Sequence, residues 1–167
     1  MANKPTGWGK VSLLYGTPTS SQEMATTLVK MGDILENSLS IEQQEGTKLQ
    51  LYAEGHILKD ELQLEGTNSI KATLIGIPED TRKKFWATDN AGETVSSMIT
   101  ASKFSIKLVP HVLGAETLSA PYCSINLGMA YSSQQGWTAP VTVTILQNEA
   151  GKFFEFGTVI QADLNEA

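Results

Sequence analysis

Apolar and polar residues alternate in short runs from Leu39 onward, and a glycine-bearing turn separates the runs about every ten residues. Alternation with a period of two is typical of β-strands that bury one face and leave the other in water. Four such strands are predicted within residues 32–77. Their apolar positions are Leu39 and Ile41, then Leu49, Leu51 and Ala53, then Leu62 and Leu64, and finally Ile70, Ala72 and Leu74.

Short links join these four predicted strands. They are Glu45-Gly46, Glu54-Gly55 and the segment 66–68, each with a glycine that can take the positive φ a tight hairpin needs. Four strands joined by such links predict an antiparallel meander, in which each strand pairs with the next one along the chain.

A short helix is predicted over about residues 78–88. Pro78 suits the first helical position, where its missing N–H costs nothing. Acidic residues at 79–80 followed by basic residues at 82–84 complement the helix dipole at both ends. Phe85 and Trp86 provide the helix with an aromatic anchor.

Strand-like alternation returns after the helix, around residues 103–108, 123–129, 141–145 and 153–158. The pattern therefore predicts a mainly β fold, an antiparallel β-sandwich or barrel of about eight strands with one short flanking α-helix. We expect residues 32–167 to form a single domain.

Residues 1–31 are the least regular part of the chain. Glycines and prolines interrupt the first half of this segment, and Ser20 and Glu23 are spaced as a capping box. Two expectations follow, an irregular N-terminal arm or a short helix over residues 22–31, and the pattern favours neither.

Negative charge is concentrated in one part of the sequence. The chain has a net charge of −6, and residues 32–77 carry eight carboxylates against three lysines, which is −5 of that total. An acidic protein is poorly suited to gripping nucleic acid through its phosphates, although it suits a surface that must avoid gripping it. No run approaches the roughly 18 apolar residues of a membrane span, and the N-terminus shows no secretory signal.

The sequence predicts no catalytic, cofactor-binding or metal site, and we expect a protein that is not an enzyme. His56 and His111 are far apart, and neither has a neighbour at a spacing suited to metal ligation. The single cysteine, Cys123, excludes an intrachain disulfide framework, fits synthesis in the cytosol and has the periodicity of a core strand residue. Trp137 lies in a polar stretch and is the one candidate for a sugar-binding aromatic; packing on its own sheet edge or on a neighbouring subunit is the alternative.

The phrases GDILENSLSIEQQEGTKLQLYAEG and LIGIPEDTRKKFW resemble the major tail tube proteins of long-tailed phages and their prophages. The resemblance covers residues 32–86; beyond that it rests on the number of strands, and residues 1–31 depart from the pattern. It implies a virion structural protein, made in the host cytoplasm and located in the viral tail. Its copies would form hexameric rings that stack, with other tail proteins, into a tube. DNA would pass through this tube without specific binding, and no cofactor or membrane would be involved. The resemblance extends to the tube of type VI secretion, which shares the fold.

Self-assembly also agrees with the strand pattern. The strands have few prolines and few inward charges, so their edges are unguarded, and closure of a ring would pair them. An acidic sheet would give the tube a lumen that repels phosphate. The candidate lumen-facing carboxylates are Glu42, Glu45, Glu54, Asp60, Glu61 and Glu65. The alternative for these residues is the ordinary solvated face of a sheet.

Two points stay open in the sequence. Residues 1–31, 132–140 and 162–167 all qualify as the segment that would bridge stacked rings. A competing function is a monomeric β-sandwich binding module for carbohydrate or peptide, which predicts exposed aromatic side chains clustered on one face. An enzyme on a jelly-roll scaffold would need a pocket with convergent carboxylates or histidines, and the sequence shows no sign of one.

Overall fold

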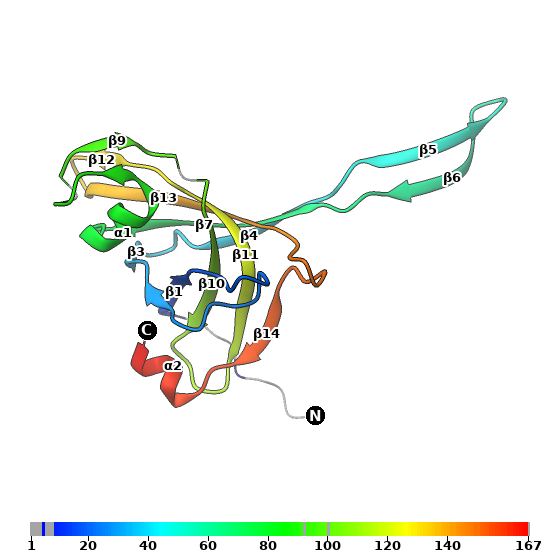
Figure 1. The fold of residues 1–167 in the computed structure, drawn as a ribbon. Helices are drawn as coiled ribbons and strands as arrows, with labels where there is room; N and C mark the ends of the chain where they lie inside the picture. Colours follow the sequence, from blue (N-terminus) through cyan, green and yellow to red (C-terminus); the bar gives the residue numbers. More distant parts are fainter. Residues whose placement is uncertain (1–4, 6–8, 92, 100, 167) are drawn as a thin grey trace.

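A computed structural model of the chain describes residue 5 and residues 9–91, 93–99 and 101–166. Its main part is a body built on one curled antiparallel sheet, from which a long two-stranded ribbon projects (Figure 1). Two short helices, α1 (Glu79–Phe85) and α2 (Gln161–Glu166), pack on the body. The prediction of a mainly β, antiparallel fold with a short flanking helix is confirmed.

The curled sheet contains ten strands. They are β1 (Val11–Gly16), β2 (Val29–Lys30), β3 (Asp33–Ile34), β4 (Ser40–Gln44), β7 (Thr67–Ile75), β10 (Lys103–Pro110), β11 (Glu116–Leu127), β12 (Ala130–Ser132), β13 (Gly136–Ile145) and β14 (Glu155–Thr158). The projecting ribbon contains β5 (Lys48–Ala53) and β6 (Ile57–Gln63), and a small separate pair is formed by β8 (Ala87–Thr88) and β9 (Val95–Ser97).

The sheet curls until its two ends meet. Its strand order is β2-β1-β10-β11-β13-β7-β3, and only Met31 and Gly32 separate the two end strands in the sequence. The Met31 N–H donates to the carbonyl oxygen of Leu13 at 3.0 Å, which ties this connection to β1. The body is therefore a single sheet wrapped around one core.

The inside of the curled sheet holds the main hydrophobic core. Leu13, Ile70, Ile106 and Val143 come from four different strands and are fully buried there. Because alternate residues of a strand point to one face, the period-two pattern of the sequence supplies this core directly. The predicted core position of Cys123 is confirmed, since its side chain is buried in the same cluster.

Helix α1 closes one end of this core. The Phe85 ring lies 5.1 Å from that of Tyr15 and 4.7 Å from that of Phe104, measured between ring centroids. The Thr81 hydroxyl donates to the Met31 carbonyl at 2.9 Å, and the Trp86 indole N–H donates to the Leu127 carbonyl at 2.9 Å. The aromatic anchor expected from the sequence is thus in place.

The helix is shorter than the predicted 78–88. Pro78 is the residue before the first helical one, and the helix ends at Phe85. Residues 87–88 instead form β8, which pairs with β9. The difference arises because the basic residues that suit a helix C-terminus are already those of the last turn.

A second, smaller core lies on the other face of the sheet. It contains Leu14, Val109, Ala115 and Val159, and Leu164 of α2 packs against it. The Lys107 ammonium of β10 binds the Asp163 carboxylate of α2 at 2.6 Å, so an ion pair fixes the helix to the sheet. The sequence pattern did not predict α2.

The expectation of an irregular segment over residues 1–31 is wrong for residues 11–16 and 29–30, which form β1 and β2. No helix forms over residues 22–31, since residues 29–30 pair with β1. Strand β1 was missed because Leu13, Leu14 and Tyr15 are all buried. A strand covered on both faces loses the alternation that identifies strands in a sequence.

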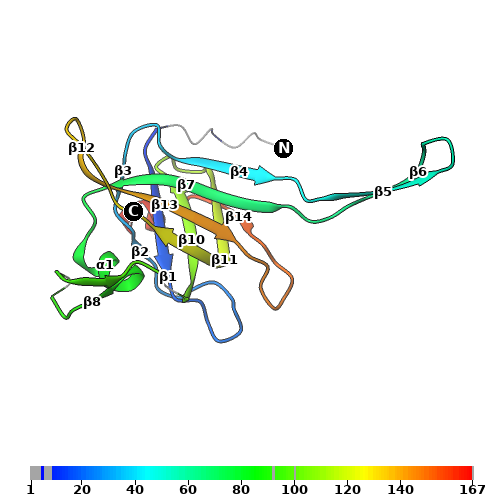
Figure 2. The ribbon, with the colours of Figure 1, turned by 90° about the horizontal axis from the view of Figure 1, so that it is seen from above.

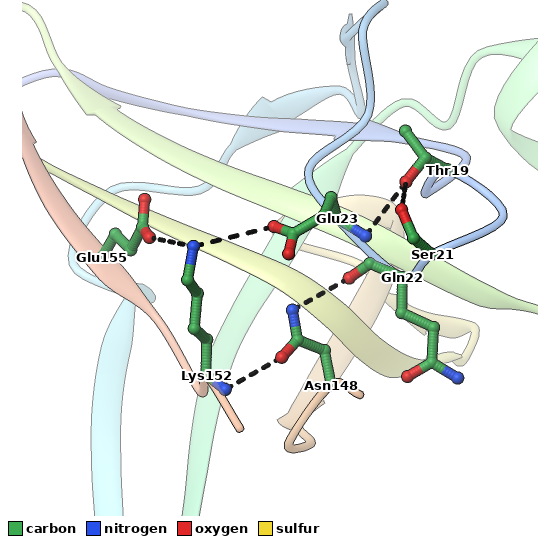
Figure 3. A network of polar contacts seen from close by, with 7 residues as sticks. All are labelled: Thr19, Ser21, Gln22, Glu23, Asn148, Lys152 and Glu155. Carbon is green, nitrogen blue, oxygen red and sulfur yellow. Dashed lines mark hydrogen bonds and ion pairs between the residues drawn. The ribbon is translucent and has the colours of Figure 1, made fainter. Parts of the chain in front are cut away.

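Loop residues 17–28 are held by polar contacts to the segment that connects β13 to β14 and to the start of β14 (Figure 3). The Asn148 side-chain N–H donates to the Gln22 carbonyl at 3.1 Å, and the Lys152 ammonium lies 3.0 Å from the Glu155 carboxylate and 3.8 Å from that of Glu23. Residues 148–151 form a turn, in which Gly151 N donates to the Asn148 carbonyl at 3.0 Å, but β13 and β14 form no hairpin, since each pairs with β11.

The predicted four-stranded meander is wrong. Strand β4 pairs with β7, and β5 pairs only with β6, so residues 40–75 form one long antiparallel ribbon. The chain passes through segments 45–47 and 64–66 without reversing, and only the turn at residues 54–56 reverses it (Figures 1 and 2). Of the three predicted turns in this region, Glu54-Gly55 is the one confirmed.

Gly46 and Gly66 allow the two chains of the ribbon to approach each other closely, and they do not reverse the chain. A Cβ atom built at Gly46 would lie under 3.0 Å from the backbone of Leu64, and one at Gly66 would lie under 3.0 Å from the carbonyl oxygen of Gln44. The two chains of the ribbon can therefore pass this point only because neither residue has a side chain.

Candidate functional site

The distal part of the ribbon, residues 45–66, is the most exposed structured segment of the molecule, and we call it the arm. All seven residues of β6 are exposed, as are all residues of β5 except Ala53. Both views show the arm extending away from the body (Figures 1 and 2). A two-stranded ribbon of this kind has no second layer of its own chain to cover it.

One face of the arm is apolar. Cross-strand partners share a face of a ribbon, and Leu49 lies opposite Leu62 while Leu51 lies opposite Asp60. Leu51 is 64% exposed, Leu62 is 59% exposed and Ile57 is 54% exposed. The apolar face of the arm consists of Leu49, Leu51, Ala53, Ile57 and Leu62, with Asp60 as its one charged residue.

The opposite face of the arm is mostly polar and internally bonded. The Gln50 side-chain N–H donates to the Glu61 carboxylate at 2.7 Å, and the Lys48 ammonium lies 3.6 Å from the same carboxylate. The hydrogen bond from Gln50, followed by the charge of Lys48, lowers the pKa of Glu61 below its usual value. This face is suited to water, whereas the apolar face is not.

The tip of the arm is a tight turn at residues 54–56. Gly55 has a φ of 85° and His56 a φ of 60°, and the His56 ring stacks on Tyr52 with centroids 4.5 Å apart. His56 is exposed, so it is a solvated residue of this turn.

The candidate acidic residues lie along the ribbon from its base to its tip. Glu42 on β4 is paired with Lys71 of β7 at 2.8 Å, and Glu54 belongs to the tip. Glu45 and Glu65 line the same hollow of about 310 Å³ at the base of the arm. Asp60 and Glu61 are neighbours on β6 and therefore point to opposite faces. The structure thus brings only Glu45 and Glu65 together, and the lumen-facing role of all six stays a prediction.

The sequence did not single out the arm as a projecting element. Residues 1–31, 132–140 and 162–167 were the candidates for a bridging segment, and the arm is none of these. One signal was available, because Gly46 and Gly66 each lie ten residues from His56. Two glycines placed symmetrically about a turn are expected to face each other in one long hairpin.

A second exposed apolar surface is formed by the hairpin of β12 and β13. Tyr131 is 64% exposed and Trp137 is 63% exposed, with their ring centroids 5.1 Å apart and their planes at 56°. Met129 beside them is 55% exposed. We call these three residues the aromatic end. The sequence identified Trp137 but not its partner Tyr131.

The described residues show little that resembles a reaction centre. The Ser12 hydroxyl lies 2.7 Å from His111 Nε2, but Ser12 is only 1% exposed, so a substrate cannot reach it. Burial, followed by the charges of Lys10 and Lys30, lowers the pKa of His111. Burial also raises the pKa of the Cys123 thiol to about 12, which keeps it protonated.

Two hollows in the described part of the chain are lined in part by carboxylates, but not by histidine or cysteine. One, of about 660 Å³, lies beside segments 9–11 and 30–39 and includes Asp33 and Glu36. The other, at the base of the arm, is the one that Glu45 and Glu65 line. Across the described ranges, no three metal-ligating side chains gather at one place. The absence of enzymatic activity stays a prediction.

In the part of the chain that the structure describes, no helix has the length and apolar character needed to cross a membrane. No protein-family model and no curated protein matches the sequence.

Proposed function

We propose that this protein is the structural subunit of a phage-type tail tube, in which copies assemble into hexameric rings that stack into a channel for DNA. The observation that carries the proposal is the arm, whose apolar face is exposed on a ribbon standing away from the body. The resemblance of residues 32–86 to major tail tube proteins supports the same function.

The energetics of the arm favour a partner outside its own chain. Isolated two-stranded hairpins are marginally stable in water. Leu49, Leu51, Ile57 and Leu62 are each slightly more than half exposed. Fully burying one such side chain contributes about 1.5–3 kcal/mol, so covering this face contributes on the order of 3–6 kcal/mol before the costs of association.

The proposed assembly has a definite contact geometry. In it the arm of one copy contacts a surface of the next copy other than that copy's arm, and the contact is not returned to the first copy. Such a heterologous contact between identical chains propagates into a closed ring or an open filament. The carboxylates of the ribbon that lie outside the apolar face of the arm would then border a channel that repels DNA phosphate.

Assembly is tested by sedimentation velocity and negative-stain microscopy over a range of protein concentrations. Wild-type protein is expected to form rings or tubes as concentration rises. The double variant L51S/L62S is expected to remain monomeric because it removes the centre of the apolar face. The matched control is Lys59→Ser, at the extra residue of the β6 bulge, which should assemble normally. A wild-type protein that stays monomeric at every concentration contradicts the proposal.

One observation favours the second candidate function, a monomeric module that binds carbohydrate or peptide. Tyr131 and Trp137 are the paired exposed aromatic residues that such a module uses. Their planes are tilted by 56°, and neither residue lines either hollow of the molecule, whereas small-molecule sites are generally concave. Binding to a glycan or peptide panel by a protein that stays monomeric would favour the module.

A further inference from the structure

We propose that the arm of one copy binds to the aromatic end of the next copy, with its apolar face on Tyr131 and Trp137 and its Asp60 carboxylate beside Lys84. This inference rests on the proposed self-assembly and names the surface that receives the arm. The two surfaces lie at opposite ends of one strand and are both exposed, and the acidic arm matches the basic last turn of α1 at the end of the body that carries the aromatic end.

Strand β7 holds the arm and the aromatic end apart within a copy. Its first residue, Thr67, follows the base of the arm, and its last residue, Ile75, pairs with Thr138, next to Trp137. Nine residues of extended strand span about 30 Å. Figures 1 and 2 both show the arm and β12 at opposite ends of the molecule. The arm therefore reaches an aromatic end only on another copy, in a head-to-tail arrangement.

The aromatic end has the composition of an interface centre. Segment 128–140 contains no charged residue. Tyr131, Trp137 and Met129 are each more than half exposed. Aromatic residues and methionine are enriched, and charged residues depleted, at the buried centres of protein interfaces. The leucine side chains of the arm are a fitting counterpart for this surface.

The charge of the arm is complementary to that of the last turn of α1. Segment 45–65 contains five carboxylates and two lysines, a net charge of −3. Helix α1 has its basic residues 82–84 in the last turn, while its acidic residues 79–80 lie in the first turn. The bond from Trp86 to Leu127 holds the end of α1 at the end of β11, from which the chain continues into β12. The basic turn and the aromatic end therefore lie at the same end of the body.

Asp60 is the carboxylate of the arm that we expect to pair with the basic turn. It is the carboxylate on the apolar face, so a contact that covers that face also covers Asp60. A buried carboxylate needs a cationic partner. Within the basic turn, Lys83 is already paired with Glu79, whereas Lys84 is exposed. Lys84 is accordingly the partner we assign to Asp60.

A charge-swap cycle tests the contact. Asp60→Lys and Lys84→Asp are each expected to raise the protein concentration needed for assembly about tenfold or more, by placing like charges together. The double variant D60K/K84D is expected to recover assembly. Trp137→Ser should also lose it, and circular dichroism verifies that each variant is folded. Wild-type-like assembly by the single variants, or no recovery by the double variant, overturns the inference.

Cross-linking tests the same contact by proximity. Asp60→Cys protein mixed with Lys84→Cys protein should give disulfide-linked dimers that contain one chain of each kind, and the buried Cys123 should not compete. Equal yields from Asp60→Cys protein alone would overturn the inference. A different result is that L51S/L62S loses assembly while Trp137→Ser and the charge variants assemble normally. The arm would then bind another surface of the next copy, and the proposed function would still hold. A monomeric wild-type protein would remove both.

Discussion

At the scale of single residues, the two glycines at the base of the arm have a role that differs from the one the sequence pattern indicates. Glycine between two strand-like runs ordinarily indicates a hairpin turn. Gly46 and Gly66 instead lie where the two chains of the ribbon come closest, and each is in contact distance of the opposite backbone. The same residue type thus serves chain reversal at Gly55 and close approach at the base.

We expect Gly66→Ala to loosen the arm without unfolding the body. The new methyl group would meet the Gln44 carbonyl oxygen, so the backbone must move and the pairing of β5 with β6 should weaken. Hydrogen–deuterium exchange should become at least several-fold faster in residues 48–63. Thr47→Ala is the control, because the bond from Leu64 N to the Thr47 carbonyl uses only backbone atoms. Unchanged exchange in Gly66→Ala would contradict this account.

At the scale of elements, α2 is attached to the sheet by the packing of Leu164 and by one ion pair. The Asp163 carboxylate binds the Lys107 ammonium at 2.6 Å and accepts a hydrogen bond from Ile160 N at 2.9 Å. Burial alone would raise the pKa of Asp163, but the hydrogen bond from Ile160 and the bond and charge of Lys107 outweigh it and lower the pKa below 3.8. The carboxylate is therefore more stable as an anion in the folded protein than in the unfolded chain.

This pKa shift predicts the acid sensitivity of α2. Because the pKa of Asp163 is lower when folded, its contribution is complete above the unfolded value of 3.8 and is lost as pH falls below that value. Asp163→Asn should cost on the order of 1–3 kcal/mol near neutral pH, measured by denaturant unfolding. The exposed pair of Lys152 and Glu155 provides the control, since Glu155→Gln should change stability by about 0.5 kcal/mol or less. Equal changes in the free energy of unfolding for Asp163→Asn and Glu155→Gln would show that burial does not strengthen the ion pair of Asp163 with Lys107.

Local pattern predicted the strands of the ribbon but not their partners. Alternation located β4, β5 and β7, because each has two different faces, but it found only the end of β6 and missed residues 57–60. It could not show that β4 pairs with β7, since pairing depends on residues distant in the sequence. It also implied that the leucines of β5 and β6 belong to the core, whereas they are exposed. A period of two identifies an apolar face and says nothing about which chain covers it.

The same reasoning explains what was found at the candidate site. Counting charges was enough to find an acidic segment at residues 32–77. The spread of its carboxylates along a single ribbon depends on the pairing and so was not visible in the sequence. Tyr131 was missed because only the hairpin of β12 and β13 brings it against Trp137.

At the scale of the whole molecule, the arm and the body are separable. The two hydrophobic cores contain residues of the body alone, and no residue of segment 45–66 belongs to either. The body should therefore keep its stability when the arm is absent. In the proposed assembly the body would provide a rigid support and the arm the contact between copies.

Removal of the arm tests this division. A chain in which residues 45–66 are replaced by a two-residue Asn-Gly turn between β4 and β7 should fold, with a Tm within a few degrees of the full chain. It should remain monomeric in sedimentation velocity at concentrations where the full chain assembles. A shortened chain that does not fold would show that the arm supports the body, and one that still assembles would show that copies meet elsewhere.

The distance that the arm reaches from the body depends on the number of residues in its two strands. Two residues added to each strand would extend it by about 6.6 Å and keep its apolar face on the same side. One residue added to each strand at the base would extend it by about 3.3 Å but turn every pair beyond the insertion to the opposite face, since facing alternates along a strand. An arm that keeps its apolar face toward the same side can thus change its reach only in steps of two residues per strand, while the body that carries it stays the same.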